Sequence, residues 1–465
     1  MPHLYIAAAH RSSGKTTLSI GLTRALQRLG LSIQPFKKGP DYIDPLWLSR
    51  STGRPCFNLD YHTMSCDEIR RSFAHHCSRV DIGFIEGNVG LFDSVDLRGT
   101  HSNAELAKLL GAPVILVVDV RGMTRGIAPL LLGYRAFDPD LQLAGVILNK
   151  VGGGRHEANL RNVVEHYTDI PVLGCVPRTS GVEIAERHLG LIPSNEALAV
   201  EATIDRIASV IVDTVDIERV AGLAQAVPFP DWDMPGDADA PPAPTGSPVR
   251  IGIAQDDAFG FYYPDDLLAL EQAGAELVPF SPVWDQMLPD VDALFIGGGF
   301  PEYRMDELER NASMRAAIAD FIIGGGPAYA ECGGLMYLTE RLHWDNKVAR
   351  MCGVLDAEVA MHERPQGRGY VRLAETAAFP WPSLAPFARE ISAHEFHHSA
   401  IIKPHPDWTY GYEVQRGVGI DGRNDGVIQG NLLASYAHLR NVGGIDWTRR
   451  FVAHIHAVAA GEAAG

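Results

Sequence analysis

The sequence is poor in cysteine, and the few cysteines it has are dispersed. Six cysteines occur among 465 residues and none form a Cys-x-x-Cys pair, which argues against a disulfide-stapled scaffold and a cysteine-rich zinc site. The first ten residues, MPHLYIAAAH, lack the charged segment and long apolar core of a signal peptide. No uninterrupted apolar run is long enough to span a membrane. These absences predict a cytoplasmic protein without a membrane partner.

Positive charge is also scarce. Lysine and arginine number 40 against 57 aspartates and glutamates, so the formal net charge is −17. Broad, sequence-independent binding to nucleic acid needs a basic face, and we therefore expect no nucleic-acid partner. An anionic substrate stays open, but its site would need basic groups gathered locally.

One stretch without apolar periodicity divides the chain into two halves. Residues 227–248, VPFPDWDMPGDADAPPAPTGSP, are rich in Pro, Gly and Asp, which is typical of an exposed interdomain linker. The prediction is a first domain over 1–226, a linker over 227–248 and a second domain over 249–465, each half of ordinary domain size.

Both halves alternate short apolar runs with helical stretches. PVILVVDV (113–120) and PAYAEC (327–332) are predicted strands, and residues 17–30, TLSIGLTRALQRLG, are a predicted helix. Continuous apolar strands separated by helices indicate parallel sheets covered on both faces. The fold class is therefore α/β in both halves.

A phosphate-binding turn is predicted near the N-terminus. Residues 7–22, AAAHRSSGKTTLSIGL, would form a strand, a turn and the start of a helix. The core Gly14-Lys15-Thr16 matches the end of a P-loop, in which glycine lets the backbone approach phosphate, lysine reaches phosphate oxygens and threonine holds Mg²⁺. The first glycine of the pattern is Ala9 here, so the loop is non-standard, and an ordinary strand-to-helix turn is the alternative. The residues predicted to bind ATP are Ser13, Gly14, Lys15, Thr16 and Thr17.

Acidic residues close to predicted strand ends support a nucleotide site. Asp41 and Asp44 lie in KKGPDYIDP, and Glu86 ends the apolar run DIGFIE. A carboxylate at such a strand end is where phosphate-bound Mg²⁺ usually finds its protein ligand. We predict Thr16, Glu86 and Asp41 as magnesium ligands, with a solvated loop acid as the alternative for each carboxylate. Asn149, after the run GVIL, is predicted to contact the nucleotide base.

One cysteine stands in a setting that suits a nucleophile. In PAYAECGGLMYL, Cys332 follows a short apolar run and precedes two glycines. A strand that ends in a tight turn before a helix exposes one side chain and points backbone N–H groups at the atom it attacks. A small buried thiol with flexible neighbours is the alternative.

The second half also supplies the partners that such a thiol needs. His438 in SYAH is a candidate base, and the three glycines of FIGGGFPE, residues 295–302, are a candidate donor turn. We predict Gly298 and Gly333 as donors to an oxyanion. Cysteine, histidine and donor turn together form a thiol acyl-transfer site, and hydrolysis of the amide of glutamine fits that chemistry.

Ten motifs that occur in order carry a family resemblance over nearly the whole chain. They are HRSSGKTT, FKKGPDYIDP, NLD (58–60), EGNVGLFD, VILNKV, ERHLGL, GGGFPE, AECGGLMYL, HEFHHS and SYAHL. With them the chain resembles the cobyrinic acid a,c-diamide synthase family, glutamine amidotransferases that amidate acetate side chains of tetrapyrroles. The resemblance implies a P-loop NTPase-like synthetase domain over 1–226 and a class I glutamine amidotransferase-like domain over 249–465.

The resemblance also implies roles in the first half. Lys15 and Thr16 would bind the ATP phosphates and Mg²⁺, with Glu86 as a metal ligand. Asp41 and Asp44 would lie near the carboxylate that is phosphorylated.

In the second half, the resemblance makes Cys332 the nucleophile and His438 its base. Class I amidotransferases often carry Glu two residues after this histidine, but here the position is Arg440. The resemblance therefore implies a Cys-His dyad. The sequence does not identify a third partner for it. A second departure, AHRSS at residues 9–13 where relatives have more glycine, is closer to the siroheme-amidating branch.

HEFHH, residues 394–398, satisfies the letters of the zinc-protease pattern H-E-x-x-H. That site needs both histidines on one helical face, whereas the β-forming, polar-alternating flanks predict a strand. We therefore reject zinc proteolysis and predict that His397 and His398 meet substrate carboxylates or line a strand. Arg364 and Arg368 suit a substrate with many carboxylates, because Arg pairs with them bidentately; a solvated surface strand is the alternative.

The predicted reaction is ATP- and glutamine-dependent amidation of the a and c acetate carboxylates of an anionic tetrapyrrole through an acyl phosphate. The same mechanism on siroheme or sirohydrochlorin is the alternative. A cobyric acid synthase-type amidoligase fits less well, and so does a partitioning ATPase of the P-loop type. Such an ATPase leaves Cys332 and His438 without a role and favours an extra lysine where this chain has His10. A homodimer is kept as a hypothesis.

Overall fold

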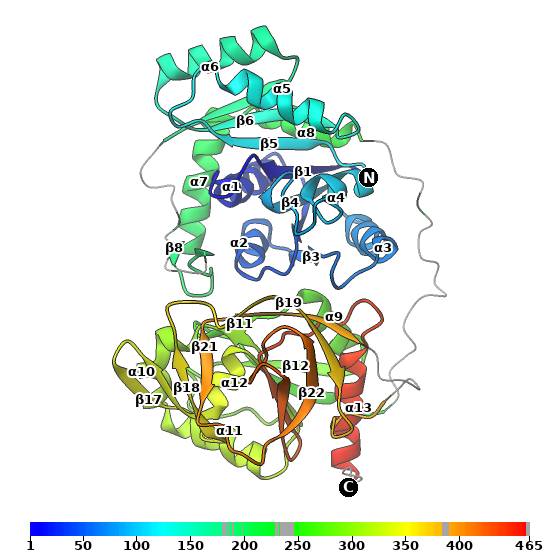
Figure 1. Cartoon of the computed structure of the whole chain (residues 1–465), viewed down its shortest axis with the longest axis vertical. Coiled ribbons are helices and arrows are strands. Elements are labelled where there is room, and N and C mark those ends of the chain that lie inside the picture. Colours follow the sequence, from blue (N-terminus) through cyan, green and yellow to red (C-terminus); the bar gives the residue numbers. More distant parts are fainter. Residues whose placement is uncertain are drawn as a thin grey trace. The chain divides into compact units, whose positions relative to one another are not determined.

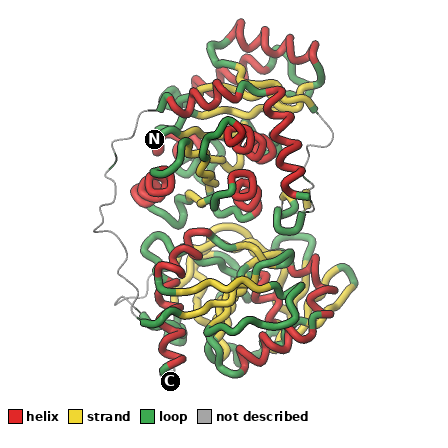
Figure 2. The backbone as a smooth tube through the Cα atoms, turned by 180° about the vertical axis from the view of Figure 1, so that it is seen from behind, coloured by secondary structure: helices red, strands yellow, loops and turns green. Residues whose placement is uncertain are grey.

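The computed structural model describes residues 1–178, 184, 186–187, 190–197, 199–227, 232, 246–383 and 390–461 (Figures 1 and 2). The chain divides into two compact units, Met1–Asp239 and Ala240–Gly465. The linker predicted over 227–248 lies for the most part outside the described residues. Within the described residues, no helix has the length and apolar character needed to cross a membrane.

The first unit is built on a parallel seven-stranded sheet with the strand order β3-β2-β4-β1-β5-β6-β7. Its strands are β1 (His3–Ala8), β2 (Ile33–Lys38), β3 (Phe57–Leu59), β4 (Ile82–Gly90), β5 (Val114–Asp119), β6 (Leu143–Val151) and β7 (Val172–Pro177), followed by the short pair β8 (Glu186–Arg187) and β9 (Gly190–Leu191). Its helices are α1 (Lys15–Arg28), α2 (Ile43–Thr52), α3 (Cys66–Cys77), α4 (Asn103–Leu110), α5 (Ile127–Phe137), α6 (Gly154–Tyr167), α7 (Val200–Thr214) and α8 (Ile217–Gln225).

Helices cover both faces of this sheet, as Figure 2 shows. Ile82 and Phe84 of β4 pack into a core shared with α1, α2, α7 and α8. The residue between them, Gly83, faces the other way, where a Cβ would meet Phe73 and Cys77 of α3. Two buried faces explain why the strands read as continuous apolar runs, and the predicted α/β class is confirmed.

The strand order brings the predicted phosphate-binding residues to one edge of the sheet. β4 lies between β1 and β2, and all three strands run in the same direction. Glu86 is in register with Lys37 of β2 and with Ile6 of β1. The turn after β1, the end of β2 and the carboxylate of β4 therefore meet at the carboxyl edge of the sheet, where open α/β sheets bind ligands.

The second unit is built on a mixed nine-stranded sheet with the order β12-β10-β13-β15-β24-β23-β22-β19-β20 and on a four-stranded sheet with the order β17-β16-β18-β21. Its strands are β10 (Val249–Ala254), β11 (Phe259–Phe261), β12 (Ala275–Phe280), β13 (Ala293–Ile296), β14 (Gly298–Gly299), β15 (Ala328–Glu331), β16 (Thr339–Trp344), β17 (Lys347–Arg350), β18 (Leu355–Met361), β19 (Gly367–Glu375), β20 (Ile391–His397), β21 (Ser399–Ile402), β22 (Thr409–Arg416), β23 (Asn424–Gln429) and β24 (Leu432–Ser435). Its helices are α9 (Pro264–Gln272), α10 (Met305–Arg310), α11 (Ala312–Ile323), α12 (Gly333–Leu338) and α13 (Trp447–Ala459), with a 3₁₀ turn at Pro301–Arg304.

The parallel part of this sheet is also covered on two faces. Residues of α11 and α12 share one core with Leu294 and Ile296 of β13. Residues of α9 and α13 share the opposite core with Phe295 of the same strand. β15 and β24 are parallel neighbours in which Glu331 pairs with Ser435, so the turn after β15 lies beside the segment that carries His438.

Candidate active sites

The turn between β1 and α1 is braced from β6. Gly14 caps α1 with φ +83°, a left-handed conformation that favours glycine. The side-chain amide of Asn149 donates to the carbonyl of Ser13 at 2.8 Å, and a Cβ on Gly14 would lie 2.4 Å from that amide nitrogen. The Lys150 ammonium donates to the Ser12 carbonyl at 2.9 Å. Asn149, predicted to contact the base, thus also fixes the backbone of the predicted phosphate loop.

A cavity opens beside this turn. Thr17 and Asn149 line it together with Pro177 and Arg178 at the end of β7. Its place at the first turn of α1 suits a nucleotide whose phosphates meet the amides at the start of that helix. The base prediction for Asn149 stays a prediction.

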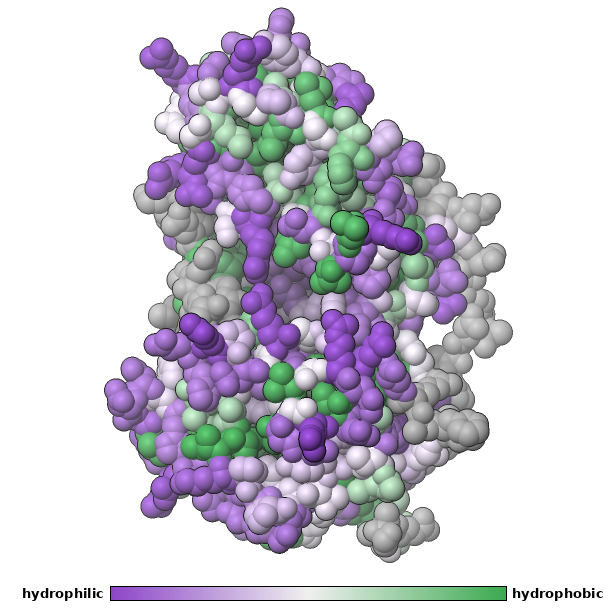
Figure 3. Space-filling view, in the orientation of Figure 1, coloured by the Kyte–Doolittle hydropathy of each residue, from purple (hydrophilic) through white to green (hydrophobic). Residues whose placement is uncertain are grey.

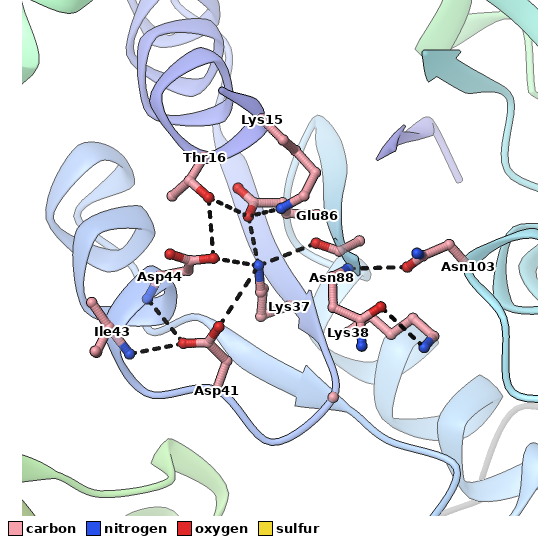
Figure 4. A network of polar contacts seen from close by, with 12 residues as sticks. Lys15, Thr16, Lys37, Lys38, Asp41, Ile43, Asp44, Glu86, Asn88 and Asn103 are labelled. Carbon is pink, nitrogen blue, oxygen red and sulfur yellow. Dashed lines mark hydrogen bonds and ion pairs between the residues drawn. The ribbon is translucent and has the colours of Figure 1, made fainter. Parts of the chain in front are cut away.

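Carboxylates and ammonium groups form one buried network at the sheet edge (Figure 4). The Lys15 ammonium donates to Glu86 Oε1 at 2.5 Å. The Lys37 ammonium donates to Asp44 Oδ2 at 2.5 Å and to Glu86 Oε1 at 2.6 Å. The Thr16 hydroxyl lies 3.1 Å from Asp44 Oδ2 and 3.1 Å from Glu86 Oε1. The motifs predict or imply four residues of this network, namely Lys15, Thr16, Asp44 and Glu86. Its fifth member, Lys37, was missed by sequence reasoning.

Lys37 is the least exposed cation of this network, with 1% of its side chain accessible. Burial disfavours its charge, but Asp44 and Glu86 more than compensate and raise its pKa well above the usual value. Burial lowers the pKa of Lys15, against the attraction of Glu86. The sequence signal was the pair of lysines that ends a buried strand, because a lysine there needs a buried counter-ion.

The carboxylates respond to the same charges. Burial and the neighbouring Asp41 raise the pKa of Asp44 to about 6, in opposition to Lys37. Burial would raise the pKa of Glu86, but Lys15 and Lys37 hold it well below its usual range. The two lysines therefore favour the anionic form of Glu86, whereas burial and Asp41 disfavour that of Asp44.

Asp41 lies at the rim of the network. Its Oδ1 accepts the backbone amides of Ile43 and Asp44 at 2.9 and 3.1 Å, and its Oδ2 is 3.9 Å from the Lys37 ammonium. The two amides belong to the start of α2, so Asp41 fixes the entry to that helix. The Asp41 side chain as a whole is 35% exposed.

The network suits a magnesium ion at two of the three predicted ligands. Glu86 Oε2 is buried and has no hydrogen-bond partner among the described residues, and the Thr16 hydroxyl lies beside Glu86. Across the part of the chain that the structure describes, three or more His, Cys, Asp or Glu side chains nowhere form a metal-binding group. Magnesium on a nucleotide needs only one or two protein ligands, because phosphates and waters supply the others. Thr16 and Glu86 fit that need better than Asp41, which lies at the rim.

Cys332 lies at the sharp turn between β15 and α12. Its φ of +47° and ψ of −100° are strained for a residue with a side chain. Its amide donates to the Ser435 carbonyl at 2.7 Å. A Cβ on Gly334 would lie 2.0 Å from the backbone oxygen of Ile296, so only glycine lets α12 approach β13 this closely. The turn has the form of a nucleophile elbow.

The thiol of Cys332 is buried, and burial raises its pKa strongly. Glu302 raises it further, while a hydrogen bond from the backbone amide of Gly333 lowers it. The raised pKa disfavours the thiolate, so this thiol holds its proton more firmly than an ordinary cysteine. It therefore needs a base at the moment it attacks a substrate.

His438 lies next to the glycine turn that follows β13. A Cβ on Gly298 would lie 2.6 Å from His438 Cε1 and 3.4 Å from Nε2. A Cβ on Gly333 would lie 3.0 Å from the amide nitrogen of Gly299. The glycine turn, the start of α12 and the predicted base therefore lie close together. Gly299 also lies next to Gly333, one of the two predicted oxyanion donors.

Glu331 is the second residue that sequence reasoning missed. Its Oε2 lies 3.3 Å from His438 Nδ1, and its Oε1 accepts the Leu439 amide at 2.9 Å and the Tyr329 hydroxyl at 2.6 Å. The side chain is almost fully buried. The only local signal was an acid at the end of an apolar strand, directly before the cysteine.

Residues 394–397 of HEFHH lie on β20 and His398 directly follows it, so the predicted strand is confirmed and these residues do not form the helix of a zinc protease. His397 is buried, stacks on Tyr436 with ring centroids 3.8 Å apart and bonds through Nδ1 to the Ser399 carbonyl. His398 is buried and bonds through Nδ1 to the His362 carbonyl. Their geometry fits the prediction of lining a strand, and contact with substrate stays a prediction.

The two predicted arginines lie on the surface. Arg364 is exposed in the segment before β19. Arg368 is exposed on β19, with its guanidinium 5.3 Å from the centre of the Phe396 ring. Both are accessible to an anion, but within this unit they do not join the cluster around Cys332.

Comparison with known proteins gives independent evidence on the family of this chain. Residues 4–192 match the family model described as a CobQ/CobB/MinD/ParA nucleotide binding domain, and residues 250–442 match that of a CobB/CobQ-like glutamine amidotransferase domain. A curated relative from Magnetococcus marinus, named cobyrinate a,c-diamide synthase, is 46% identical over 96% of both chains. Proteins of the same name from Syntrophotalea carbinolica and Methanosarcina acetivorans are 42% and 41% identical, over 97% and 95% of this chain and 98% and 93% of theirs.

Proposed function

Since the chain belongs to the cobyrinate a,c-diamide synthase family, we propose that it converts the a and c acetate carboxylates of cobyrinate to amides. ATP supplies the energy and glutamine the nitrogen. The observation that carries this proposal is the presence in one chain of two chemically different sites, a phosphate turn with buried cations and a strained cysteine elbow beside a histidine. Neither site alone makes an amide from a carboxylate and glutamine.

The reaction needs activation, because hydroxide is too poor a leaving group for ammonia to displace from a carboxylate. Transfer of the γ-phosphoryl group to the carboxylate gives an acyl phosphate, from which ammonia displaces phosphate. Lys15 and Lys37 offset the repulsion between a triphosphate and an anionic acceptor. Asp44 and Glu86 keep both ammonium groups aimed at the sheet edge, as their hydrogen bonds indicate.

Magnesium is part of the proposal. Thr16 and Glu86 would hold it, because the buried Glu86 Oε2 needs a partner, with Asp41 as an outer ligand. When bound, the ion would supply positive charge to the phosphate oxygens. Ser13, Gly14 and Thr17 would bind the nucleotide through the turn and the first turn of α1.

The second unit would release ammonia. His438 takes the proton of Cys332, the sulfur attacks the side-chain carbonyl of glutamine, and the collapsing intermediate expels ammonia with a proton returned by His438. Amides of Gly298 and Gly333 would stabilise the oxyanion. Water then hydrolyses the thioester to glutamate and restores the thiol.

This division of labour assigns 1–226 to synthetase chemistry, 249–465 to glutamine hydrolysis and 227–248 to the linker. Arg364 and Arg368 would meet carboxylates of the anionic tetrapyrrole, since the chain as a whole is acidic. His397 and His398 stay candidates for the same contact, although both side chains are buried. A cytoplasmic location is part of the proposal and rests on the six free, scattered cysteines.

Self-association into a homodimer is also proposed. α5 is strongly apolar in sequence but buries only Ile127, Ala128 and Leu131. It leaves 42% of Leu132 and 75% of Phe137 exposed, and Figure 3 shows apolar side chains where Figure 1 labels α5. Exposed apolar surface of this kind often marks a protein interface.

The first experiment is mass spectrometry of candidate rings after incubation with protein, ATP, Mg²⁺ and glutamine. Cobyrinate is expected to gain two amides. Cys332→Ala is expected to give the same product with ammonia and none with glutamine, because only the nitrogen source is lost. Amidation of siroheme or sirohydrochlorin alone would move the substrate to the alternative ring, and ATP hydrolysis without any glutaminase activity would overturn the proposal.

A further inference from the structure

Many class I amidotransferases orient the catalytic histidine with a glutamate two residues after it, but the residue at that position here cannot play this role. Two residues after His438 stands Arg440, a cation. Its guanidinium pairs with Asp265 and lies 4.6 Å from the centre of the Tyr263 ring. Arg440 is therefore committed to α9 and its N-terminal flank, and a cation would repel the positive charge that the base acquires during catalysis.

A carboxylate reaches His438 from another element. Glu331 Oε2 lies 3.3 Å from His438 Nδ1. Glu331 is the last residue of β15, and its backbone pairs in register with Ser435 at the end of β24. The buried side chain of Glu331 thus links β15, the strand that leads to Cys332, with the segment that carries His438.

Glu331 is itself held in a single orientation. Its Oε1 accepts the Leu439 amide at 2.9 Å and the Tyr329 hydroxyl at 2.6 Å. The backbone of His438 is fixed separately, since its amide donates to the His394 carbonyl at 2.8 Å. With Oε1 occupied, Oε2 is the oxygen that faces the imidazole.

We propose that Glu331 is the positioning residue of His438, so that the cysteine site is a Cys332–His438–Glu331 triad whose acid precedes the nucleophile in sequence. A carboxylate at ion-pair distance from Nδ1 favours the tautomer that carries the ring proton on that nitrogen, so that the lone pair of Nε2 can accept the thiol proton. Nε2 is also the nitrogen that neighbours Gly298 in the donor turn. After proton transfer, the carboxylate stabilises the imidazolium in a buried site, where an unpaired charge is costly.

The inference rests on the proposed glutaminase activity and is tested with the full chain. Glu331→Gln keeps a carbonyl oxygen for the Leu439 amide and the Tyr329 hydroxyl but turns an NH₂ group toward Nδ1, which favours the wrong tautomer. Glutaminase kcat is expected to fall by about 10²–10⁴-fold with little change in KM for glutamine. Ammonia-dependent amidation is expected to stay at the native rate, because that route does not use the triad.

A double-mutant cycle separates positioning from general stability. In a His438→Ala background, Glu331→Gln is expected to cost less than about threefold, since its effect passes through the histidine. Glu375→Gln removes another largely buried carboxylate of this unit, one that is paired with Arg450, and it is expected to leave glutaminase kcat close to native.

Equal kcat for Glu331→Gln and the native chain would overturn the triad, and so would equal losses in the native and His438→Ala backgrounds. A native chain that hydrolyses no glutamine would instead overturn the proposed function itself. The two failures are therefore distinguishable.

Discussion

A buried ammonium group is stable only when anions compensate for its lost hydration. Lys37 meets this condition with two carboxylates at hydrogen-bond distance, Asp44 and Glu86. Its neighbour Lys38 is also buried, but its ammonium contacts Asn88 Oδ1 at 3.3 Å, and burial lowers its pKa to about 8. Adjacent lysines on one strand thus have opposite environments, because alternate strand residues face opposite sides.

This contrast gives a matched pair of variants. Lys37→Met is expected to lower ATP-dependent amidation by at least about 10²-fold, since the removed charge faces the phosphoryl-transfer site and its loss leaves two carboxylates in repulsion. Lys38→Met removes a buried lysine of similar size and is expected to lose less than about tenfold. The measurement is product formation with ammonia as nitrogen source, together with glutaminase kcat.

Glutaminase kcat is expected to be native in both variants, because the cysteine site belongs to the other unit. A Lys37→Met chain that amidates cobyrinate as fast as Lys38→Met would contradict a role for Lys37 in phosphoryl transfer. Thermal unfolding of both variants shows whether the loss reflects chemistry or folding.

The residues that sequence reasoning missed share a physical property. Lys37 and Glu331 act on partners that are distant in sequence, at Glu86 and His438, and only the strand order brings them together. By contrast, Gly14, Lys15, Thr16 and Cys332 stand in local patterns that carry their chemistry. Local spacing identifies turns and nucleophiles, whereas the choice of counter-ion depends on which strands are neighbours.

At the turn after β15, close packing of backbone against backbone decides which residues are allowed. Gly334 lies where a Cβ would be 2.0 Å from the Ile296 carbonyl oxygen, and the contact is with main chain that cannot rotate away. Cys332 meanwhile has φ +47°. A displacement of α12 from β13 would relieve both constraints and move the thiol away from the donor turn.

We therefore expect Gly334→Ala to abolish glutaminase activity and to destabilise the second unit by about 1–3 kcal/mol, the usual cost of overpacking. Gly222→Ala is the control, because that glycine lies within α8 and a Cβ there meets nothing within 4 Å. It is expected to stabilise the chain by about 0.5–1 kcal/mol through helix propensity. Denaturant unfolding and glutaminase assays measure both effects, and native activity in Gly334→Ala would show that the close approach is dispensable.

Most strands of the first unit were predictable, because a parallel sheet buried on both faces leaves continuous apolar runs in the sequence. PVILVVDV and DIGFIE correspond to β5 and the start of β4. The order of those strands was not predictable, since apolar runs carry no record of their neighbours. The antiparallel strands after β15 were also harder to predict, because their half-exposed faces, as in β19, mix polar and apolar residues.

Across the whole molecule, the two proposed sites make and consume the same intermediate. Ammonia at neutral pH is mostly protonated and unreactive toward an acyl phosphate, so ammonia released at Cys332 is most useful if it reaches the acceptor before it equilibrates with water. Each unit has its own core, so loss of one activity need not unfold the other unit. Glutamine hydrolysis and amide formation can therefore be measured separately, and the nitrogen atom can be followed from one reaction to the other.

Isotope labelling follows that nitrogen atom. We propose that ammonia from glutamine reaches the acceptor before it mixes with the free pool. Glutamine-driven turnover in the presence of excess ¹⁵N-ammonium is then expected to give product with little ¹⁵N. Cys332→Ala under the same conditions is expected to give fully labelled product, which shows that the synthetase site itself accepts ammonia from solution. Mass spectrometry of the diamide reads both results. Product of the native chain that carries ¹⁵N in proportion to the free pool would mean that ammonia escapes before it is used, and the proposed transfer between the two activities would then be wrong while both chemistries stand.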